Sequence, residues 1–224
     1  MKKTFRTAFL DTVPVMTGYL FLGFGFGILA VQNQFSIWWA LAMSVLIYAG
    51  SMQFVAISLL SGGTGLVTAA LTTLAVNARH IFYGLSMIDR YKGTGRKKPY
   101  LIFALTDETY SLVSQGAPRK DGGRYYFLVS LLDQCYWVLG TLLGAAVGQL
   151  LPINYEGIDF VLTALFVTIF VEQWLSTKNH IPALIGLGGS VVCLILFGSG
   201  TFLIPSMGVI ALLLLLTRKK EEAK

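Results

Sequence analysis

Three short polar tracts interrupt a chain that is otherwise strongly apolar, and their side chains could bind a small charged molecule or an ion. The tracts are Tyr48–Gln53, Asn77–His80 and Thr106–Thr109. Glycine, amides and charged groups are costly inside a lipid bilayer, so membrane proteins usually retain them for a substrate or ion pathway. The tracts therefore favour transport chemistry over the role of a passive membrane anchor.

The first tract contains Gly50, Ser51 and Gln53. Gly50 and Ser51 can open a helix and release backbone N–H and C=O groups, and such half-helix ends bind a carboxylate or a cation. Gln53, one turn after Gly50, could add a neutral hydrogen bond to a substrate. The alternative is a glycine that packs between helices and a serine that bonds to its own backbone.

The second tract combines an amide, a cation and an imidazole in Asn77, Arg79 and His80, with Tyr83 one turn later. Asn77 and His80 share a helix face, and Arg79 shares another with Tyr83. Arg79 could pair with an acid or hold a substrate carboxylate, and His80 could carry a proton near neutral pH. Alternatively, Arg79 extends to the lipid headgroups, because the basic stretch 89–99 is near.

The third tract places Asp107 and Glu108 between Thr106 and Thr109. An acidic pair beside threonines could coordinate Na⁺, accept a proton or meet a substrate ammonium group. The alternative is a helix start, in which Thr106 or Asp107 is the capping residue and the acids complement the helix dipole. The two interpretations are compatible.

Two further carboxylates, Asp133 and Glu172, lie inside apolar segments. A lone carboxylate in lipid is protonated or paired, so both are candidates for proton coupling, together with His80, Asp107 and Glu108. The sequence contains no nucleotide-binding loop, metal-ligand cluster or Ser/His/Asp arrangement. We therefore expect no enzyme activity, no metal or other cofactor, and an energy source other than ATP.

The elements that position these residues are predicted to be membrane helices. The 224 residues are 55% hydrophobic and 12% charged, and the mean hydropathy is +0.69. Apolar runs approach or exceed the ~20 residues that cross a ~30 Å hydrocarbon core. We predict an all-α, multi-pass integral membrane protein, a single domain over 1–224 with about seven to eight segments, some broken or re-entrant. The segments lie at about 13–31, 37–60, 65–88, 125–151, 157–175, 181–197 and 201–217, with a weaker one at about 100–116.

Basic residues lie between the apolar runs, so the net charge of +6 indicates membrane orientation and not nucleic-acid binding. They cluster at the N-terminus, at 89–99, at 117–124 and at the C-terminus. The positive-inside rule places all four clusters in the cytoplasm, but three full crossings before residue 89 would place the second outside. We therefore expect one of the first three segments to leave on the side where it enters, with the break at Gly50 as one candidate. The stretch 100–116 is expected to re-enter or to lie in the interface.

A tyrosine followed by two glycines recurs with the same spacing in the two halves of the chain, as Tyr19-x3-Gly23-x3-Gly27 and Tyr136-x3-Gly140-x3-Gly144. Residues four apart share a helix face, so each series forms a smooth groove for a close helix neighbour. The recurrence suggests repeat halves at about 12–90 and 125–200, with a substrate site at their interface. The alternative is that glycine-rich faces are simply common in helical membrane proteins.

The chain resembles, over nearly its whole length, the large subunit of the AzlC-type branched-chain amino acid exporters. Four sequence signatures carry the resemblance and occur in the same order as in that family. They are Ala49-Gly50-x-x-Gln53-Phe54, Arg79-His80-x-x-Tyr83-Gly84, Leu105-Thr106-Asp107-Glu108 and Trp137-Val138-x-Gly140-Thr141-x-x-Gly144. Two positions depart from the family pattern: Asn77 stands where some relatives carry aspartate, and Asp133 has no matching acid.

The resemblance implies export of leucine, isoleucine and valine, with methionine as a further candidate. It also implies a location in the bacterial cytoplasmic membrane, a small AzlD-type membrane partner subunit and coupling to the proton motive force. In our hypothesis, N–H groups near Gly50 or the Arg79 side chain hold the substrate carboxylate, and Asp107 or Glu108 faces its ammonium group. His80 or one of those acids carries the proton. The alternative function is a passive channel, or an exporter of other small metabolites.

Overall fold

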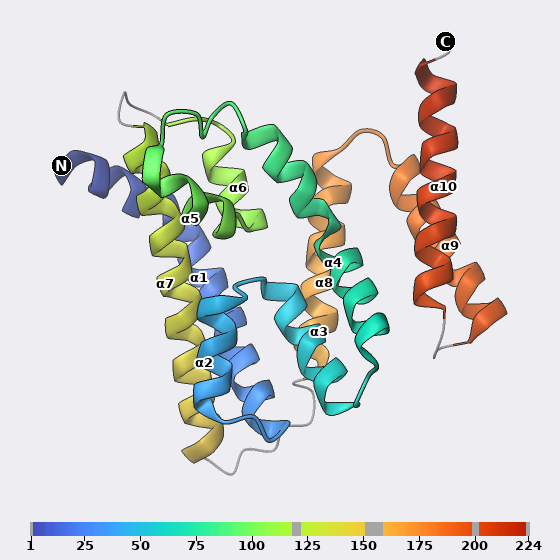
Figure 1. Ribbon diagram of the computed structural model, residues 1–224, viewed down its shortest axis with the longest axis horizontal. Helices are drawn as coiled ribbons and strands as arrows, with labels where there is room; N and C mark the ends of the chain where they lie inside the picture. The colour runs from blue at the N-terminus through green and yellow to red at the C-terminus, as the bar shows by residue number, and fades with distance from the viewer. Residues whose placement is uncertain (1, 118–121, 151–158, 199–201, 223–224) are drawn as a thin grey trace. The chain divides into compact units, whose positions relative to one another are not determined.

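The computed structural model describes residues 2–117, 122–150, 159–198 and 202–222, and every regular element in these ranges is a helix (Figure 1). The chain divides into two compact units, of which the first contains residues 1–64 and 76–162 and the second residues 65–75 and 163–224. All three polar tracts lie in the first unit, so this unit carries the candidate site.

The first unit contains two long helices, several short ones and the second half of α4. Its elements are α1 (Lys2–Gln32), α2 (Ile37–Leu46), α3 (Gly50–Ser61), α4 (Leu66–Met87, from Val76 on), η1 (Gly95–Lys97), α5 (Lys98–Phe103), α6 (Asp107–Val113) and α7 (Gly122–Leu150). The second unit contains the first half of α4, most of α8 (Asp159–Ser176), α9 (Ile181–Phe197) and α10 (Leu203–Glu222). The all-helical prediction is confirmed for the described residues.

Among the described residues, α1 and α7 are the two helices long and apolar enough to cross a membrane. Helices α2, α3 and α9 are apolar but shorter. The predicted segment 37–60 is divided into α2 and α3, and the weaker segment 100–116 contains only α5 and α6. The predicted number of seven to eight spans therefore stays a prediction.

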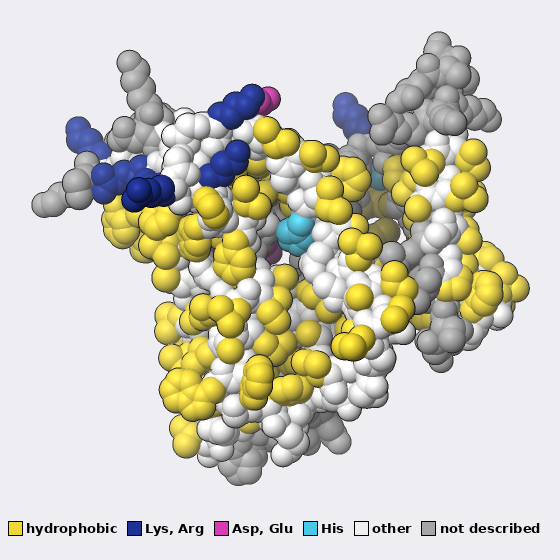
Figure 2. All heavy atoms as spheres, in the orientation of Figure 1, with side chains coloured by type: hydrophobic (Ala, Val, Ile, Leu, Met, Phe, Trp, Pro, Cys, Tyr) yellow, Lys and Arg dark blue, Asp and Glu magenta, His cyan; other side chains and the backbone are white. Residues whose placement is uncertain are grey.

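Large apolar side chains on the outside of the first unit indicate lipid as its solvent. Phe21, Trp38 and Phe82 are 71%, 79% and 70% exposed. Figure 2 shows hydrophobic side chains spread over the visible face, while Lys and Arg gather at one end of this unit. Apolar surface this extensive is rare on soluble monomers and typical of a face that meets a membrane or a partner.

Helices α1 and α7 pack with their backbones almost in contact, because glycines line both faces. A Cβ atom added to Gly23 would lie 2.7 Å from the carbonyl oxygen of Trp137, and one added to Gly140 would lie 2.7 Å from that of Leu20. The two glycine series predicted to form grooves are thus each other's neighbours. Whether they also mark repeat halves stays a prediction.

The two helices run in the same direction. Gly140 lies against Leu20, Gly144 against Phe24 and Gly148 against Ile28, so the residue numbers at the contact increase in the same direction along both helices (Figure 1). The start of α7 is joined to the start of α1 by a hydrogen bond of 2.8 Å from the Tyr125 hydroxyl to Asp11.

The N-terminal ends of α1 and α7 share a hydrophobic cluster with the C-terminal end of α4. Ala8, Met87, Tyr91 and Tyr125 are buried members of this cluster. The N-terminal basic residues, the basic stretch 89–99 and Arg124 therefore lie toward the same end of the unit, here termed the basic end. This is the arrangement that the positive-inside rule requires.

The α2–α3 pair explains how the chain reaches that arrangement. The Ser61 hydroxyl at the end of α3 donates a 3.4 Å hydrogen bond to the Asn33 amide oxygen, just before α2. The pair thus ends where it began, at the end of the unit opposite the basic end. Only α1 and α4 connect the two ends before residue 89, which removes the third crossing as the charge pattern requires.

Helices α5 and α6 form a second short pair, which starts and finishes at the basic end. They have 6 and 7 residues, about 10 Å each, which is far less than a bilayer core. Leu101 of α5 and Val113 of α6 belong to the cluster at the basic end, while Thr106, between the two helices, reaches Tyr19 in the middle of α1. The predicted re-entrant path of 100–116 agrees with this geometry.

We predict that Gly144→Ala lowers the thermal stability of the purified protein, whereas Gly18→Ala does not. A methyl group at Gly144 would collide with the backbone carbonyl of Phe24, and overpacking of this kind costs about 1–3 kcal/mol. Gly18, also on α1, has no atom within 4 Å of an added Cβ, and alanine there gains helix propensity. Unfolding midpoints in detergent measure both effects, and equal midpoints for the two variants would contradict the packing described.

Candidate functional site

The candidate site begins at the break between α2 and α3. Tyr48 has a positive φ of 44°, a conformation that is uncommon for a residue other than glycine and that turns the chain sharply. Helix α3 then starts at Gly50 with no side chain bonded to its first turn. Its leading N–H groups, at the positive end of a 12-residue helix, are suited to an anion.

Buried hydrogen bonds hold the two half-helices against α7. The Gln53 amide donates to the Ser44 hydroxyl at 3.1 Å and accepts from the Trp137 indole at 3.0 Å. Ser44 also lies 2.8 Å from the Thr141 hydroxyl, and Gln53 is fully buried. Gln53 thus contacts the protein through both polar atoms of its amide. These contacts describe a residue that positions the break, and its predicted role in binding substrate stays a prediction.

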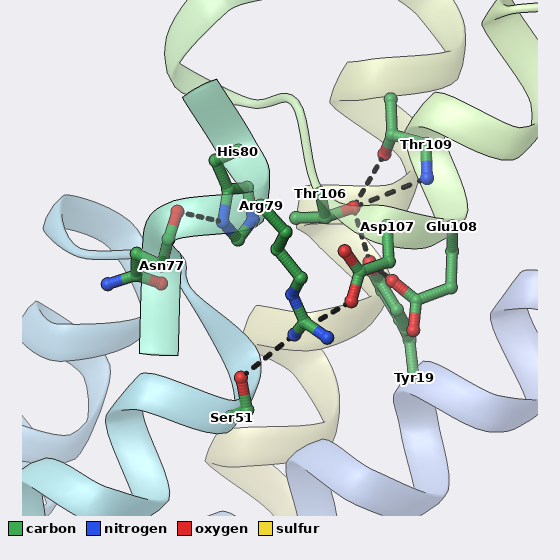
Figure 3. Close-up of polar contacts among 9 residues, drawn as sticks. All are labelled: Tyr19, Ser51, Asn77, Arg79, His80, Thr106, Asp107, Glu108 and Thr109. Atoms are coloured by element: carbon green, nitrogen blue, oxygen red, sulfur yellow. Dashed lines mark hydrogen bonds and ion pairs between the residues drawn. The ribbon is translucent and has the colours of Figure 1, made fainter. Parts of the chain in front are cut away.

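Arg79 links the break to the third tract. Its guanidinium forms a 2.8 Å ion pair with Asp107 and donates a 3.1 Å hydrogen bond to the Ser51 hydroxyl (Figure 3). Arg79 lies on α4, Asp107 at the start of α6 and Ser51 in the first turn of α3. The guanidinium is therefore directed at the site in this structure and not toward the headgroups.

A cavity of about 240 Å³ is lined in part by residues that flank Arg79 and Asp107 in the sequence. Its wall comes from the break, from α4 and from the end of the α5 region, and is formed by Ile47, Tyr48, Ala49, Asn77, His80, Gly84, Ile102, Phe103 and Leu105. The lining is mainly apolar with a few polar groups, which is the usual composition of a small-molecule site.

Several buried polar atoms of the cavity wall and of the ion pair have no hydrogen-bond partner among the described residues. The Tyr48 hydroxyl and Asn77 Oδ1 belong to the cavity wall, and Arg79 Nε and Asp107 Oδ1 belong to the ion pair. Buried polar groups are nearly always paired in native proteins, so each unpaired atom needs an explanation.

His80 and Tyr83 take different positions around the cavity. His80 lines it, and its Nδ1 lies 3.3 Å from the backbone carbonyl oxygen of Asn77. Tyr83 packs edge-on against His80 and stacks on Tyr110 with 4.4 Å between ring centroids. Tyr83 is outside the cavity lining, and it faces Asp107 and Arg79 of the ion pair as well as His80.

The third tract contains both the cap and the acids that the sequence predicts. The Thr106 hydroxyl accepts a hydrogen bond from the Thr109 N–H at 3.3 Å and so caps α6, which starts at Asp107. Glu108 accepts a 2.6 Å hydrogen bond from the Tyr19 hydroxyl. The tract therefore combines a helix start with a polar site, as its two compatible interpretations allow.

Asp133 is fully buried in the middle of α7. Its Oδ2 accepts a 2.8 Å hydrogen bond from Thr109, and its Oδ1 has no partner among the described residues. The sequence singled out this acid, but not Thr109 as its partner or Tyr19 as a partner of Glu108. The sequence feature that marks Tyr19 is its position as the first residue of the series Tyr19-x3-Gly23-x3-Gly27. The side chain of Glu172, on α8, lies outside the part that the structure describes.

The fold and the site together define a multi-pass membrane protein in which broken helices enclose a polar site, an arrangement typical of secondary transporters. Comparison with known sequences identifies the family. The model of the AzlC protein family matches residues 14–151, and the chain belongs to that family.

Relatives in several bacteria extend the likeness to nearly the whole chain. The branched-chain amino acid transport protein AzlC of Bacillus subtilis is 47% identical over 223 residues, which are 98% of this chain and 88% of the relative. An uncharacterized membrane protein of Helicobacter pylori is 43% identical over 98% of this chain and 97% of its own length. The inner membrane protein YgaZ of Escherichia coli is 29% identical over 87% of this chain and 82% of its own. No solved structure matches the chain.

We predict that Gln53→Ala destabilises the protein by about 1–3 kcal/mol, because the Trp137 indole N–H then stays buried without a partner. In a Trp137→Phe background the same substitution is expected to cost less, because that donor is already absent. Gln149→Ala, at an exposed position of α7, serves as the control. Unfolding midpoints of the four combinations in detergent form the test, and equal costs in both backgrounds would contradict the hydrogen bond.

Proposed function

We propose that the protein exports branched-chain amino acids from the cytoplasm, driven by the proton motive force and together with a small AzlD-type membrane subunit. Membership of the AzlC family and the name of the Bacillus subtilis relative, a branched-chain amino acid transport protein, support the substrate class. The observation that carries the proposal is the Arg79–Asp107 ion pair, bonded to Ser51, together with the mainly apolar cavity that residues flanking both partners in the sequence help to line.

The substrate carboxylate binds between Arg79 and the first turn of α3. Arginine presents a planar fork of donors that fits a carboxylate, and its Nε is unpaired here. The uncapped N–H groups that begin at Gly50 add the positive end of the helix dipole. Ser51, which already bonds the guanidinium, keeps the two donors together.

The substrate ammonium group binds to the unpaired acceptors on the other side. Asp107 Oδ1 and Asn77 Oδ1 are both buried and lack a partner among the described residues. A zwitterion can therefore insert between Arg79 and Asp107, with its two charges replacing the charges that the ion pair provides. The empty site stays neutralised by its own ion pair, which limits the cost of charges at this depth.

The aliphatic side chain occupies the apolar part of the cavity. Ile47, Ile102, Phe103 and Leu105 supply hydrophobic wall and no hydrogen bonds to a substrate side chain. Such a pocket discriminates by only about 1–3 kcal/mol per methylene. Leucine, isoleucine, valine and methionine are accordingly expected to compete for the same site.

We predict that Arg79→Ala lowers leucine efflux by about 30-fold, because removing one partner of a desolvated, hydrogen-bonded charge pair costs about 2 kcal/mol or more and this pair is only partly exposed. Arg79→Lys keeps the charge but loses the planar fork, so an intermediate loss is expected. The assay follows leucine efflux from dipeptide-loaded cells that lack the endogenous exporter, with this chain expressed alone or with an AzlD-type subunit.

Arg96→Ala removes an exposed arginine of η1 and is the matched control. Wild-type efflux by Arg79→Ala, with the variant present in the membrane, would contradict the substrate site. A passive channel would be favoured if leucine efflux stopped when the internal and external leucine concentrations were equal and if a protonophore did not change the efflux rate. Efflux of other metabolites without leucine would favour a different export substrate.

We predict that Gly84→Val reduces leucine and isoleucine efflux more than valine efflux. Gly84 lines the cavity, and an added Cβ meets no atom within 4 Å, so the new side chain takes space from the ligand and does not displace protein atoms. The expected change in preference is about 1–3 kcal/mol, or roughly 5- to 150-fold. Gly18→Val, at an open position of α1, should leave the preference unchanged, and an unchanged preference in Gly84→Val would place the side-chain pocket elsewhere.

A further inference from the structure

A continuous chain of hydrogen-bonding distances connects Glu108 to Asp133 through three hydroxyl groups. Glu108 Oε2 lies 2.6 Å from the Tyr19 hydroxyl, which lies 2.6 Å from the Thr106 hydroxyl. The Thr106 hydroxyl lies 3.0 Å from that of Thr109, which lies 2.8 Å from Asp133 Oδ2. Figure 3 shows the first four of these residues beside the Arg79–Asp107 pair.

The chain is shielded from solvent over most of its length. Tyr19 and Thr106 are 3% and 7% exposed, and Thr109 and Asp133 are fully buried, whereas Glu108 at the other end is partly exposed. It lies next to the proposed substrate site, because Asp107 and Glu108 are neighbours on α6 and Glu108 also faces Arg79. A proton on this chain can therefore respond to the substrate without touching it.

Counting hydrogens along the chain defines the number of protons it holds. A hydroxyl group donates one hydrogen bond through its single hydrogen, and its oxygen can accept hydrogen bonds from other groups. The three hydroxyls thus supply three hydrogens for four short oxygen–oxygen contacts. If both carboxylates were ionised, one contact would bring two oxygens together with no hydrogen between them. One added proton, on either carboxylate, completes all four contacts.

We propose that Glu108 and Asp133 share a single proton, which passes between them through Tyr19, Thr106 and Thr109, and that this is the proton-binding site of the transporter. With the proton on Glu108, every hydroxyl donates toward Asp133. When Glu108 gives its proton to Tyr19, each hydroxyl passes its own hydrogen onward and Asp133 receives the last one. The negative charge moves to Glu108, and the number of protons is unchanged.

The surroundings of Asp133 independently favour a bound proton that neutralises its carboxylate. A fully buried carboxylate without a cationic partner is expensive when ionised, and its Oδ1 has no partner among the described residues. The titratable groups that face Asp133 are neutral or acidic: Tyr19, Tyr48, Tyr100, Glu108 and Tyr125. Glu108, in contrast, faces Arg79 as well as Asp107 and Tyr19.

This difference couples the proton to the substrate and rests on the proposed export function. In this structure Arg79 pairs with Asp107, and in the proposed substrate complex it pairs with the substrate carboxylate while Asp107 meets the ammonium group. The charges beside Glu108 are therefore rearranged when substrate binds, and the position of the shared proton responds to this rearrangement.

Infrared spectroscopy of the purified full-length protein tests the shared proton directly, because the C=O stretch of a protonated carboxyl group is distinct from that of a carboxylate. We expect one such band at neutral pH. Asp133→Asn should abolish it, because the amide N–H supplies the missing hydrogen and leaves Glu108, which faces Arg79, ionised. Glu108→Gln should shift it, because the proton is then confined to the buried Asp133. Asp89→Asn, at an exposed surface ion pair, should leave the band unchanged. No band in the wild type, a band that survives Asp133→Asn, or a band that Glu108→Gln leaves unchanged overturns the proposal.

A pair of threonine variants tests the path without removing either carboxylate. Thr109→Val interrupts the chain and Thr109→Ser preserves it. In proteoliposomes with the AzlD-type subunit, Thr109→Val should lose protonophore-sensitive leucine efflux but keep leucine exchange at equal pH, while Thr109→Ser keeps both. Protonophore-sensitive efflux at the wild-type level in Thr109→Val overturns the path. So does an infrared band that disappears when Na⁺ is added, since the chain would then be a cation site.

The two proposals fail in different ways. If the wild type neither effluxes nor exchanges leucine, the export function is wrong, and the infrared comparison still decides whether the two acids share a proton. If leucine is exported but the band does not respond to the amide variants, the export function holds and the shared proton is wrong.

Discussion

The close packing of α1 against α7 is the constraint on which the other features of the first unit depend. Glycines on both helices bring the backbones together, and a Cβ atom at Gly23, Gly27, Gly140 or Gly144 would collide with the opposite main chain. This contact leaves Tyr19, Asp133 and Trp137 at defined positions along the helix pair. Without a hydrophobic driving force between helices in lipid, small residues that permit close van der Waals packing are the main means of fixing such a pair.

Two broken pairs approach this framework from opposite ends and meet near its middle. The α2–α3 pair is held to α7 through Gln53, and the α5–α6 pair through Thr109, while Arg79 of α4 joins them by contacting both Ser51 and Asp107. Irregular backbone at membrane depth is tolerated only where protein or a polar cavity surrounds it. The breaks are therefore consistent with a binding site and hard to explain in a purely structural bundle.

Much of the site could be predicted from the sequence, because each polar tract is local and unusual in an apolar chain. The break at Gly50, the cap at Thr106 and the re-entrant paths required by the basic residues all agree with the structure. The pairing of tracts could not be predicted in the same way. Tyr19 and Glu108 are 89 residues apart, and Gln53 and Trp137 are 84 apart, so nothing local marks them as partners. Glycine spacing predicted that α1 and α7 each have a close neighbour, but not that they are neighbours of each other.

The most direct test of this account is the side of the membrane on which each end of the α2–α3 pair lies. Single cysteines at Ser36, Ser61 and Lys92, in a chain whose free Cys135 and Cys193 are replaced by serine, can be labelled with an impermeant maleimide in intact and in lysed cells. We expect labelling at positions 36 and 61 in intact cells, and at position 92 only after lysis. Labelling of positions 36 and 61 from opposite sides would contradict it, because the half-helices would then form one continuous crossing and could not meet the α5–α6 pair at mid-depth.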